Sequence, residues 1–478
     1  MTELLVGVSS VGIDPPLPFD PQGFVRRARA VRRYGDPLTV RACVVKRGAL
    51  EVAICAADMA NIDQAFAQKI REVIERQTGI PFENILLNSS HTHAAPWARV
   101  DHKLHGEFEF NTEAETAFFN RLPFDYASAV ILAQERLMPA RISGGVGRAP
   151  GIAVNRRERT PDGRTILGWN PEGFVDEDVP TIRIDSVDGL PIATVVGFGC
   201  HPVVLGGEVE LSGPDFVGAL RDDVEARRGG VCLFLQGAAG NVLPLEAFHA
   251  QPGPEKVMGS RLATAALESI VDQDPRAAEI VKVAYGSVTP ISLYRREVAE
   301  NQTEQSFHAT RKVLELPLLA PMTREAMEVE LVSRRSELSE LERRSATRAE
   351  INPIAYHVRW LESMIARSLI GELPRSVSTE INAIRLGDTA IVGTPGELFS
   401  ELGAEVRRRS PFPTTIFAGY CQGVLGYVAT AEEYAFGGYE PAVAQRGYGM
   451  PAPFAPEAGH ILVEQAVALL ELLNDPGY

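Results

Sequence analysis

The first part of the chain alternates short apolar runs with one stretch of helical periodicity. Residues 38–45 and 51–57 are rich in β-branched and small apolar side chains, and the short turn between them predicts a β-hairpin. Residues 61–79 then place apolar side chains at helical spacing, with Gly79 as a stop signal. Residues 83–90 form another apolar run. Strand, helix and strand in close succession predict a βαβ unit and hence an α/β protein.

The rest of the chain continues this alternation. Further strands are predicted at 181–185, 192–200, 231–237, 381–387 and 389–394, and helices at 214–228, 258–271, 396–409 and 458–474. The predicted fold is therefore a mixed β-sheet core flanked by helices. Residues 322–372 differ, because they are dense in Glu and Arg with Leu at helical intervals, which predicts a helical hairpin insertion. It is interpreted as a solvated insertion or a dimer contact rather than a lid, since nothing in it looks catalytic.

Composition and charge narrow the partners. The 478 residues carry a formal net charge of −15, which disfavours nucleic acid and anionic lipid surfaces as partners. No apolar run approaches the length of a transmembrane helix, and the N-terminus lacks the features of a signal peptide. The five cysteines are scattered and form no CxxC pair. We therefore expect a reduced, cytoplasmic protein without disulfides.

Polar groups follow several of the predicted strands, at the positions where α/β sheets bind ligands. These groups include His91, His93, His201, the turn 237–241, Glu397 and Tyr420. His91 and His93 lie on the same side of an extended segment, and two histidines with a carboxylate form a common catalytic zinc set. Each residue also has a structural interpretation: the histidines as satisfied core or surface groups, and Glu397 as a carboxylate favoured at the start of a helix.

Several better-known motifs are absent from the sequence. It contains no HExxH, no GxSxG elbow and no phosphate-binding P-loop, and the glycine-rich segment 144–151 does not fit a dinucleotide site. His102, His105 and Glu107 could form a second metal cluster, but a solvated loop is the favoured interpretation.

The ordered motifs resemble those of one enzyme family. The opening GVSSVGIDPP, the hairpin GDPLTVRACVV, the motif SHTH at residues 90–93, GCHP at 199–202, GAAGN at 237–241, TPGELF at 394–399 and GYVATAEEY at 426–434 occur in family order. The sequence resembles the neutral/alkaline non-lysosomal ceramidase family, in particular its N-terminal zinc amidase domain. The resemblance covers about residues 4–478 and implies the fold of that domain.

The resemblance also implies a set of site residues. The implied zinc ligands are His91, His201, Glu397 and Tyr427. His93 is implied to act beside the metal, and Arg156 and Tyr439 to contact the reacting carbonyl. The residues by themselves leave open that Arg156 is a surface charge and Tyr439 a core aromatic residue.

The sequence departs from the family in ways that bear on the substrate. Leu243 occupies the position of a family serine implicated in catalysis, and the family's secretion signal and extra C-terminal domain have no counterpart. The expected function is therefore zinc-dependent cleavage of an amide bond in a non-ceramide or small substrate. The alternatives are an esterase or lactonase at the same zinc site, an amidohydrolase-type (β/α)₈ barrel, and a non-catalytic binding protein.

The spread of the implied ligands bears on domain organisation. One site built from positions 91 to 427 needs nearly the whole chain, so residues 1–478 are expected to form a single catalytic domain that contains the insertion 322–372. The expected partners are a small-molecule or lipid-like amide substrate, with no nucleic acid and no stable membrane insertion. A homo-oligomer would form through residues 322–372.

Overall fold

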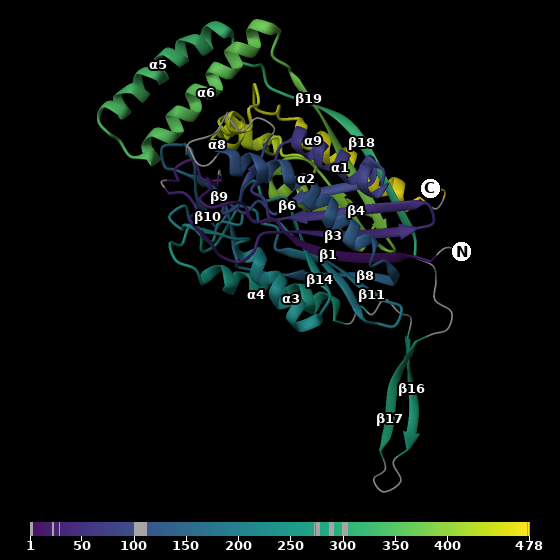
Figure 1. Cartoon of the computed structure of the whole chain (residues 1–478). Helices are drawn as coiled ribbons and strands as arrows, with labels where there is room; N and C mark the ends of the chain where they lie inside the picture. The colour runs from purple at the N-terminus through teal and green to yellow at the C-terminus, as the bar shows by residue number, and fades with distance from the viewer. Residues whose placement is uncertain are drawn as a thin grey trace.

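A mixed eight-stranded sheet forms the centre of the molecule (Figure 1). The computed structural model describes residues 3–21, 23–27, 29–99, 112–271, 273, 278–285, 291–298, 305–475 and 477. The strand order is β14 (Val231–Gln236), β12 (Pro191–Phe198), β11 (Asp178–Ser186), β8 (Met138–Arg148), β1 (Leu5–Gly12), β3 (Thr39–Arg47), β4 (Leu50–Ala57) and β6 (Ile85–Ser89). The pairs β4–β6 and β12–β14 are parallel and the other pairs antiparallel. The predicted hairpin and βαβ unit are thus confirmed.

A second sheet packs against the first. Its strands are β18 (Phe307–Pro317), β19 (Ser376–Leu386), β20 (Thr389–Gly393) and β22 (Thr414–Ala418). Leu233 and Leu235 of β14 share a buried cluster with Ile391 and Ile416 of this second sheet. The alternating Cys232 and Phe234 point to the opposite face, because side chains of a strand repeat every two residues.

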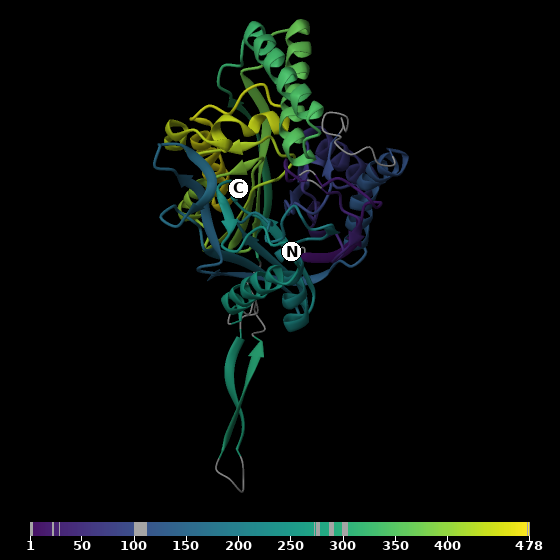
Figure 2. The same cartoon turned by 90° about the vertical axis from the view of Figure 1, so that its left-hand side faces the viewer.

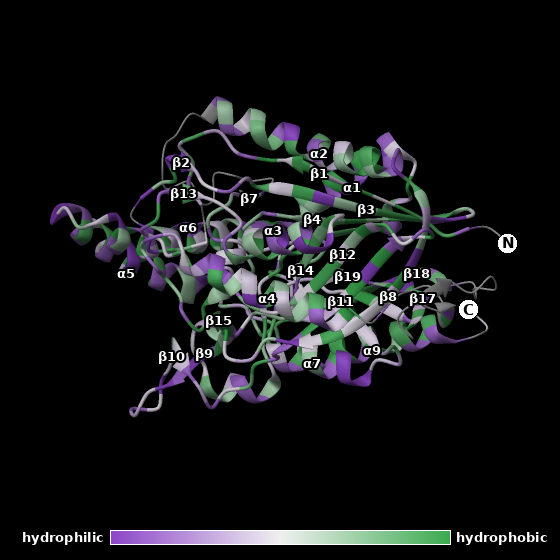
Figure 3. Ribbon diagram, turned by 90° about the horizontal axis from the view of Figure 1, so that it is seen from below, coloured by the Kyte–Doolittle hydropathy of each residue, from purple (hydrophilic) through white to green (hydrophobic). Residues whose placement is uncertain are grey.

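Helices cover the outer face of each sheet. The main sheet is covered by α1 (Gln64–Thr78), α2 (Thr112–Gln134), α3 (Phe216–Arg228) and α4 (Pro254–Ile270), and the second sheet by α7 (Ser400–Arg409) and α9 (Ala458–Asn474). The result is four layers in the order helix, sheet, sheet, helix. Figure 3 shows α1 and α2 on one side and α7 and α9 on the other, with largely hydrophobic strands between them.

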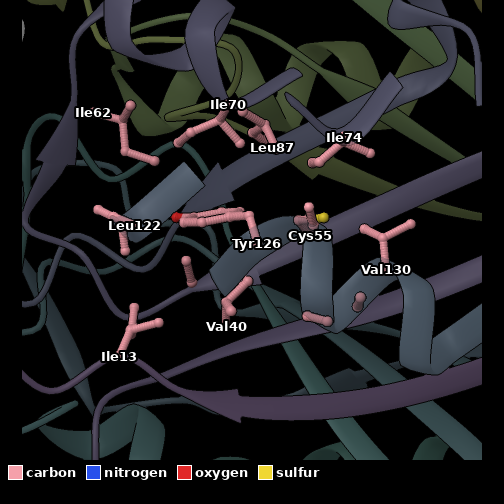
Figure 4. Packing of buried hydrophobic residues seen from close by; sticks show 14 of the residues in the cluster. Ile13, Val40, Cys55, Ile62, Ile70, Ile74, Leu87, Leu122, Tyr126 and Val130 are labelled. Carbon is pink, nitrogen blue, oxygen red and sulfur yellow. The ribbon is translucent and has the colours of Figure 1, made fainter. Parts of the chain in front are cut away.

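The core beneath α2 is well filled. The fully buried Tyr126 ring lies among Leu122, Val40 and Cys55, between the helices and the sheet (Figure 4). All five cysteines of the chain are buried and free. Burial raises the pKa of the Cys55 thiol to about 12, so this thiol packs as a small apolar group rather than as a nucleophile.

Two hairpins project from the layered body (Figures 1 and 2). The helices α5 (Arg324–Arg343) and α6 (Arg348–Ile370) form one of them and confirm the predicted helical hairpin insertion. The strands β16 (Ala278–Tyr285) and β17 (Ser292–Val298) form the other, at the opposite end of the molecule. The α-hairpin is attached to the body through Trp360, whose indole N–H donates to the Met450 carbonyl at 2.9 Å.

Short elements surround the ends of the main strands. They are β2 (Arg33–Tyr34), β5 (Asn61–Ile62), β7 (Trp97–Ala98), β9 (Ala153–Arg159), β10 (Thr165–Asn170), β13 (Leu211–Ser212), β15 (Val242–Pro244), β21 (Glu397–Leu398), β23 (Tyr427–Val428), α8 (Tyr439–Ala442) and the 3₁₀ turn η4 (Ala444–Tyr448). Most of these elements contribute residues to the site described below.

The sequence predictions differ from the structure in several places. The helix predicted over 396–409 begins only at Ser400, and Glu397 lies in β21, so the helix dipole does not account for this carboxylate. The helix α2 was not predicted, because Pro123 in its middle is a helix-breaking signal. The cluster His102, His105 and Glu107 lies outside the described residues. Among the residues that the structure describes, no helix is both long and apolar enough to cross a membrane.

Candidate metal centre

Hydrogen bonds join the ends of three strands at the positions where the sequence predicted polar groups. Asn88 in β6 donates from its side-chain amide to the Gly419 carbonyl at 2.6 Å, just after β22. Its amide oxygen accepts from the Gln236 N–H at 2.9 Å, at the end of β14. Because Asn88 is buried, these bonds fix the mutual position of the segments that follow the three strands.

Hydrogen bonds to residues 60 and 61 orient the His91 ring. Its φ of 66° lies in the left-handed region, which is uncommon for a residue with a side chain and typical of functional sites. The ring Nδ1 lies 2.6 Å from the Ala60 carbonyl and 3.1 Å from the Asn61 side-chain oxygen. Since a carbonyl only accepts, Nδ1 carries the proton, and Nε2 presents its lone pair to the site.

His201 is held in the same way from another part of the chain. Its Nδ1 lies 2.7 Å from the Ala239 carbonyl, within the GAAGN turn. Its Nε2 lies 3.1 Å from the Arg156 guanidinium, which can only donate, so this Nε2 is also an acceptor. Both histidines therefore have the tautomer, and the hydrogen bond from Nδ1 to a carbonyl, that metal-binding histidines show.

Glu397 and Tyr427 face these histidines from two short parallel strands. β21 pairs with β23 so that Glu397 lies directly opposite Tyr427. The Glu397 Oε2 atom is 3.4 Å from His91 Nε2 and 3.3 Å from His201 Nε2, and the Tyr427 hydroxyl is 3.4 Å from His201 Nε2. A Cβ atom on Gly240 would lie 2.5 Å from the Glu397 carbonyl, so only glycine lets the GAAGN turn approach this strand.

Two further tyrosines position the carboxylate. Tyr420 donates to Glu397 Oε2 at 3.2 Å, and the Tyr448 hydroxyl donates to Oε1. Tyr420 had been singled out as a polar group at a strand end, whereas Tyr448 was missed, because it sits in an irregular turn without any periodic signal. Both hydroxyls stabilise a buried, ionised carboxylate.

His93 completes a cluster of three imidazoles. Its Nε2 lies 3.2 Å from His91 Nε2, and the metal-capable nitrogens of His91, His93 and His201 all lie within 4.8 Å of one another. Its Nδ1 has no hydrogen-bond partner among the residues that the structure describes. The ring packs edge-on against Phe24 at 4.8 Å between centroids. His93 therefore lies beside the other two histidines but without their backbone support.

Arg156 and Tyr439 lie at the edge of the same site. Arg156 Nε donates to Glu440 Oε1 at 2.9 Å, while Nη2 is buried and finds no partner among the described residues. The Tyr439 ring packs edge-on against Tyr427 at 5.7 Å between centroids. The structure thus brings together every predicted site residue, and both Arg156 and Tyr439 line the same cavity as the histidines.

The electrostatics favour a positive ion at the centre. Burial lowers the pKa of His91, and burial together with Arg156 lowers the pKa of His201 to about 3. Although burial alone raises the pKa of a carboxyl group, the pKa of Glu397 lies below its usual range, and the hydrogen bond that Tyr448 donates contributes to this shift. Two neutral imidazole lone pairs thus face one ionised carboxylate oxygen with no proton between them. This donor set fits a divalent cation such as zinc.

The comparisons with known proteins bear on the fold. No protein-family model matches the chain. A segment of 126 residues is 26% identical to neutral ceramidase A of Dictyostelium discoideum, covering 25% of this chain and only 16% of that protein. The crystal structure of neutral ceramidase from Pseudomonas aeruginosa superimposes with a TM-score of 0.65 at 18% identity, over 99% of this chain and 75% of that one. The chain has the neutral ceramidase fold. A structure described as ceramidase complexed with C2 agrees, with a TM-score of 0.66, 16% identity, and coverage of 99% of this chain and 76% of that one.

Within this ceramidase-like fold, a cavity of about 510 Å³ opens onto the histidines. Its wall is largely apolar and aromatic, with several arginines and the carboxylate of Asp20, and it comes from distant segments, including α6 of the helical hairpin through Pro353, Tyr356 and His357. Leu243, at the position of the family serine, is buried in β15 and also lines the cavity. The contribution of α6 was not expected from the sequence, because its charged pattern gave no sign of which side faces a ligand.

Proposed function

We propose that this protein is a zinc-dependent hydrolase that cleaves an amide bond. The observation that carries the proposal is the convergence of three donor atoms: Glu397 Oε2 lies 3.4 Å from His91 Nε2 and 3.3 Å from His201 Nε2. These three residues and Tyr427, as a phenolate, would hold the metal. A zinc ion held there supplies a Lewis acid and an activated water at neutral pH.

The remaining site residues would act on the substrate. Hydrolysis breaks the C–N bond, forms a C–O bond to water and delivers a proton to the leaving amine. His93 Nε2 lies 3.2 Å from His91 Nε2, at the edge of the proposed donor set, where its ring would accept a proton and pass it to the amine nitrogen. Arg156 Nη2 and the Tyr439 hydroxyl would donate to the carbonyl oxygen, and each such donor is worth about 10²–10³ in rate.

The substrate proposed is an amide other than ceramide. Leu243 offers no hydroxyl at the position of the family serine, and arginines line the cavity. An uncharged lipid amide would make no use of these arginines, and its cleavage here would lack the hydroxyl that the family serine provides. Esters and lactones remain the second candidate substrates, because water can attack their carbonyl groups with the same set of donors.

Metal analysis and a substrate panel test this proposal. Purified protein should contain zinc in near-stoichiometric amount and hydrolyse at least one amide in a panel of amides, esters and lactones. His91→Ala should lose both properties, while Arg121→Met, a change of an exposed, ion-paired arginine on α2, should lose neither. Folded protein without metal would contradict the zinc proposal. Zinc-loaded protein that hydrolyses nothing in the panel would favour a binding protein instead.

A further inference from the structure

Arg99 is a buried cation in the wall of the cavity. It follows β7, is only 7% exposed, and lies with its guanidinium carbon 3.4 Å from the centroid of the Trp97 ring. Its Nη2 donates to the Gly447 carbonyl at 3.3 Å. Burial lowers the pKa of Arg99 to about 10, so the group still carries its charge at neutral pH.

In the part of the chain that the structure describes, Tyr356 and Asp63 partly offset this charge: both raise the pKa of Arg99, and Tyr356 also shares a hydrogen bond with it. There, Arg99 forms no ion pair, and its Nε has no hydrogen-bond partner. Two other buried arginines form an ion pair with a carboxylate: Arg71 is 2.5 Å from Glu380, and Arg221 is 2.9 Å from Asp58. Burying a charge without such a partner is unfavourable, and a ligand that brings the opposite charge relieves that cost.

The other arginines of the cavity wall are either paired with a carboxylate or exposed. Arg156 is paired with Glu440, and Arg446 lies 3.3 Å from Glu330. Arg26 is exposed. Arg99 is therefore the buried cation of the wall that is left to meet an anionic group of the ligand.

Arg99 lies on the same cavity as the metal centre but apart from it. The Trp97 ring packs against Tyr448 at 5.3 Å between centroids, and the Tyr448 hydroxyl is bonded to Glu397. Two aromatic rings thus separate the guanidinium from the carboxylate of the metal site. A single ligand in the cavity can therefore reach both, with its reacting carbonyl at the histidines and a second group at Arg99.

We infer that Arg99 binds a carboxylate group of the substrate, so that the amides taken by this site are anionic; the hydrolysis itself rests on the proposed function. The planar guanidinium matches a carboxylate through two parallel hydrogen bonds. Stacking on Trp97 fixes the plane of that fork before the ligand arrives. N-acylated amino acids are substrates of this class.

A matched pair of compounds tests the inference on the intact protein. N-hexanoyl-leucine carries the carboxylate, and N-hexanoyl-leucinamide replaces it with an uncharged group of the same shape. We expect the wild-type protein to bind the first about 10- to 100-fold more tightly by calorimetry, and to favour it similarly in kcat/KM. Equal binding of the two compounds would overturn the inference, whether or not either is hydrolysed.

Variants then assign the preference to Arg99. Arg99→Met should abolish the preference by weakening the binding of N-hexanoyl-leucine without changing that of N-hexanoyl-leucinamide. Arg99→Lys should retain part of the preference, since lysine keeps the charge but loses the two parallel hydrogen bonds of the guanidinium. Arg121→Met is the matched control and should leave the preference intact. A preference that survives in a folded Arg99→Met protein would place the carboxylate elsewhere and overturn the inference. If Arg99→Met does not fold, Arg99→Lys and the wild-type comparison decide.

The two proposals fail separately. Selective binding of N-hexanoyl-leucine without hydrolysis of either compound would support the Arg99 site and contradict the hydrolase. Hydrolysis of both compounds at equal rates, unchanged in Arg99→Lys, would support the hydrolase and contradict the Arg99 site.

Discussion

The candidate metal centre and the helical hairpin are built from the chain in two different ways. The candidate metal centre takes side chains from four distant segments, and His91 and His201 are each oriented by a carbonyl from another segment, as Ala60 does for His91. The hairpin is formed within residues 324–370. Its small core consists of Met327, Trp360, Leu361 and Met364, and its surface carries ion pairs between neighbouring helical turns.

This difference predicts that the candidate metal centre and the hairpin differ in local stability. The centre is ordered by contacts between remote parts of the fold, so its integrity depends on the stability of the whole domain. The hairpin has few buried contacts and many exposed side chains, such as Val329 and Val332, and can open locally at lower cost. Because Tyr356 and His357 of the hairpin line the cavity, metal binding and substrate binding are expected to respond to different mutations.

The largest expected effect comes from removing a ligand at the centre. His201→Ala should reduce hydrolysis by at least about 1,000-fold and lower zinc affinity by more than about 100-fold, because the substitution removes one of the proposed metal ligands. Zinc content and steady-state kinetics measure both. His460→Ala, which changes an exposed histidine on α9, is the control. A His201→Ala protein that retains full zinc would show that the centre is not the metal site.

The next effect concerns the support of the carboxylate. Tyr448→Phe removes one hydroxyl from the buried Glu397, and should lower zinc affinity by about 10- to 100-fold and the stability of the domain by about 1–3 kcal/mol. Competition with a chelator and urea unfolding measure these changes. Tyr294→Phe, at an exposed position in β17, should change neither quantity. An unchanged zinc affinity in Tyr448→Phe would mean that the hydroxyl does not position Glu397.

A weaker effect on chemistry is expected from loosening the hairpin. Leu361→Ala creates a cavity in its small core and should destabilise α5 and α6 locally by about 2–5 kcal/mol, detected by hydrogen exchange. Zinc content should remain unchanged, while KM rises by up to about 10-fold with little change in kcat. Val332→Ala, at an exposed position, is the control. Loss of zinc in Leu361→Ala would show that the two regions are coupled.

The same contrast explains what the sequence could predict about the fold. The helix over 458–474 and the hairpin insertion were predicted because their periodicity is local. The short strand at Glu397 was predicted as the start of a helix, because its pairing with Tyr427 is a contact between remote residues that leaves no periodic pattern. The layered packing of the two sheets is also non-local and was not foreseen in detail.

The site shows the same limit. His91, His201 and Glu397 were found from their positions after apolar runs, but Tyr427, Arg156 and Tyr439 came only from the family resemblance. Arg99 and Tyr448 were missed altogether. Their roles depend on ring stacking with Trp97 and on a turn that brings Tyr448 to the carboxylate, and neither feature follows a sequence period.

The smallest effect is a pH dependence confined to the hairpin. The His357 Nδ1 atom accepts from Arg446 at 3.0 Å, and its Nε2 lies 3.1 Å from Glu330; Arg334, Glu337 and the Trp360 ring are its other neighbours. Burial and Arg446 lower the pKa of His357 to about 4, against about 6.5 in an unfolded chain.

The sign of this dependence follows from proton binding. Between pH 6.5 and pH 4 the unfolded hairpin binds more protons than the folded one, so the stabilisation is complete above pH 6.5 and is lost as the pH falls toward 4. Because His357 is only partly buried, we expect a loss of about 1 kcal/mol, measured by hydrogen exchange of α6 at pH 7.5 and pH 4.5. His357→Gln should flatten this difference relative to wild type. An equal pH dependence in the variant would assign it to the carboxylates Glu330 and Glu337 instead, and would leave the cavity wall insensitive to this histidine.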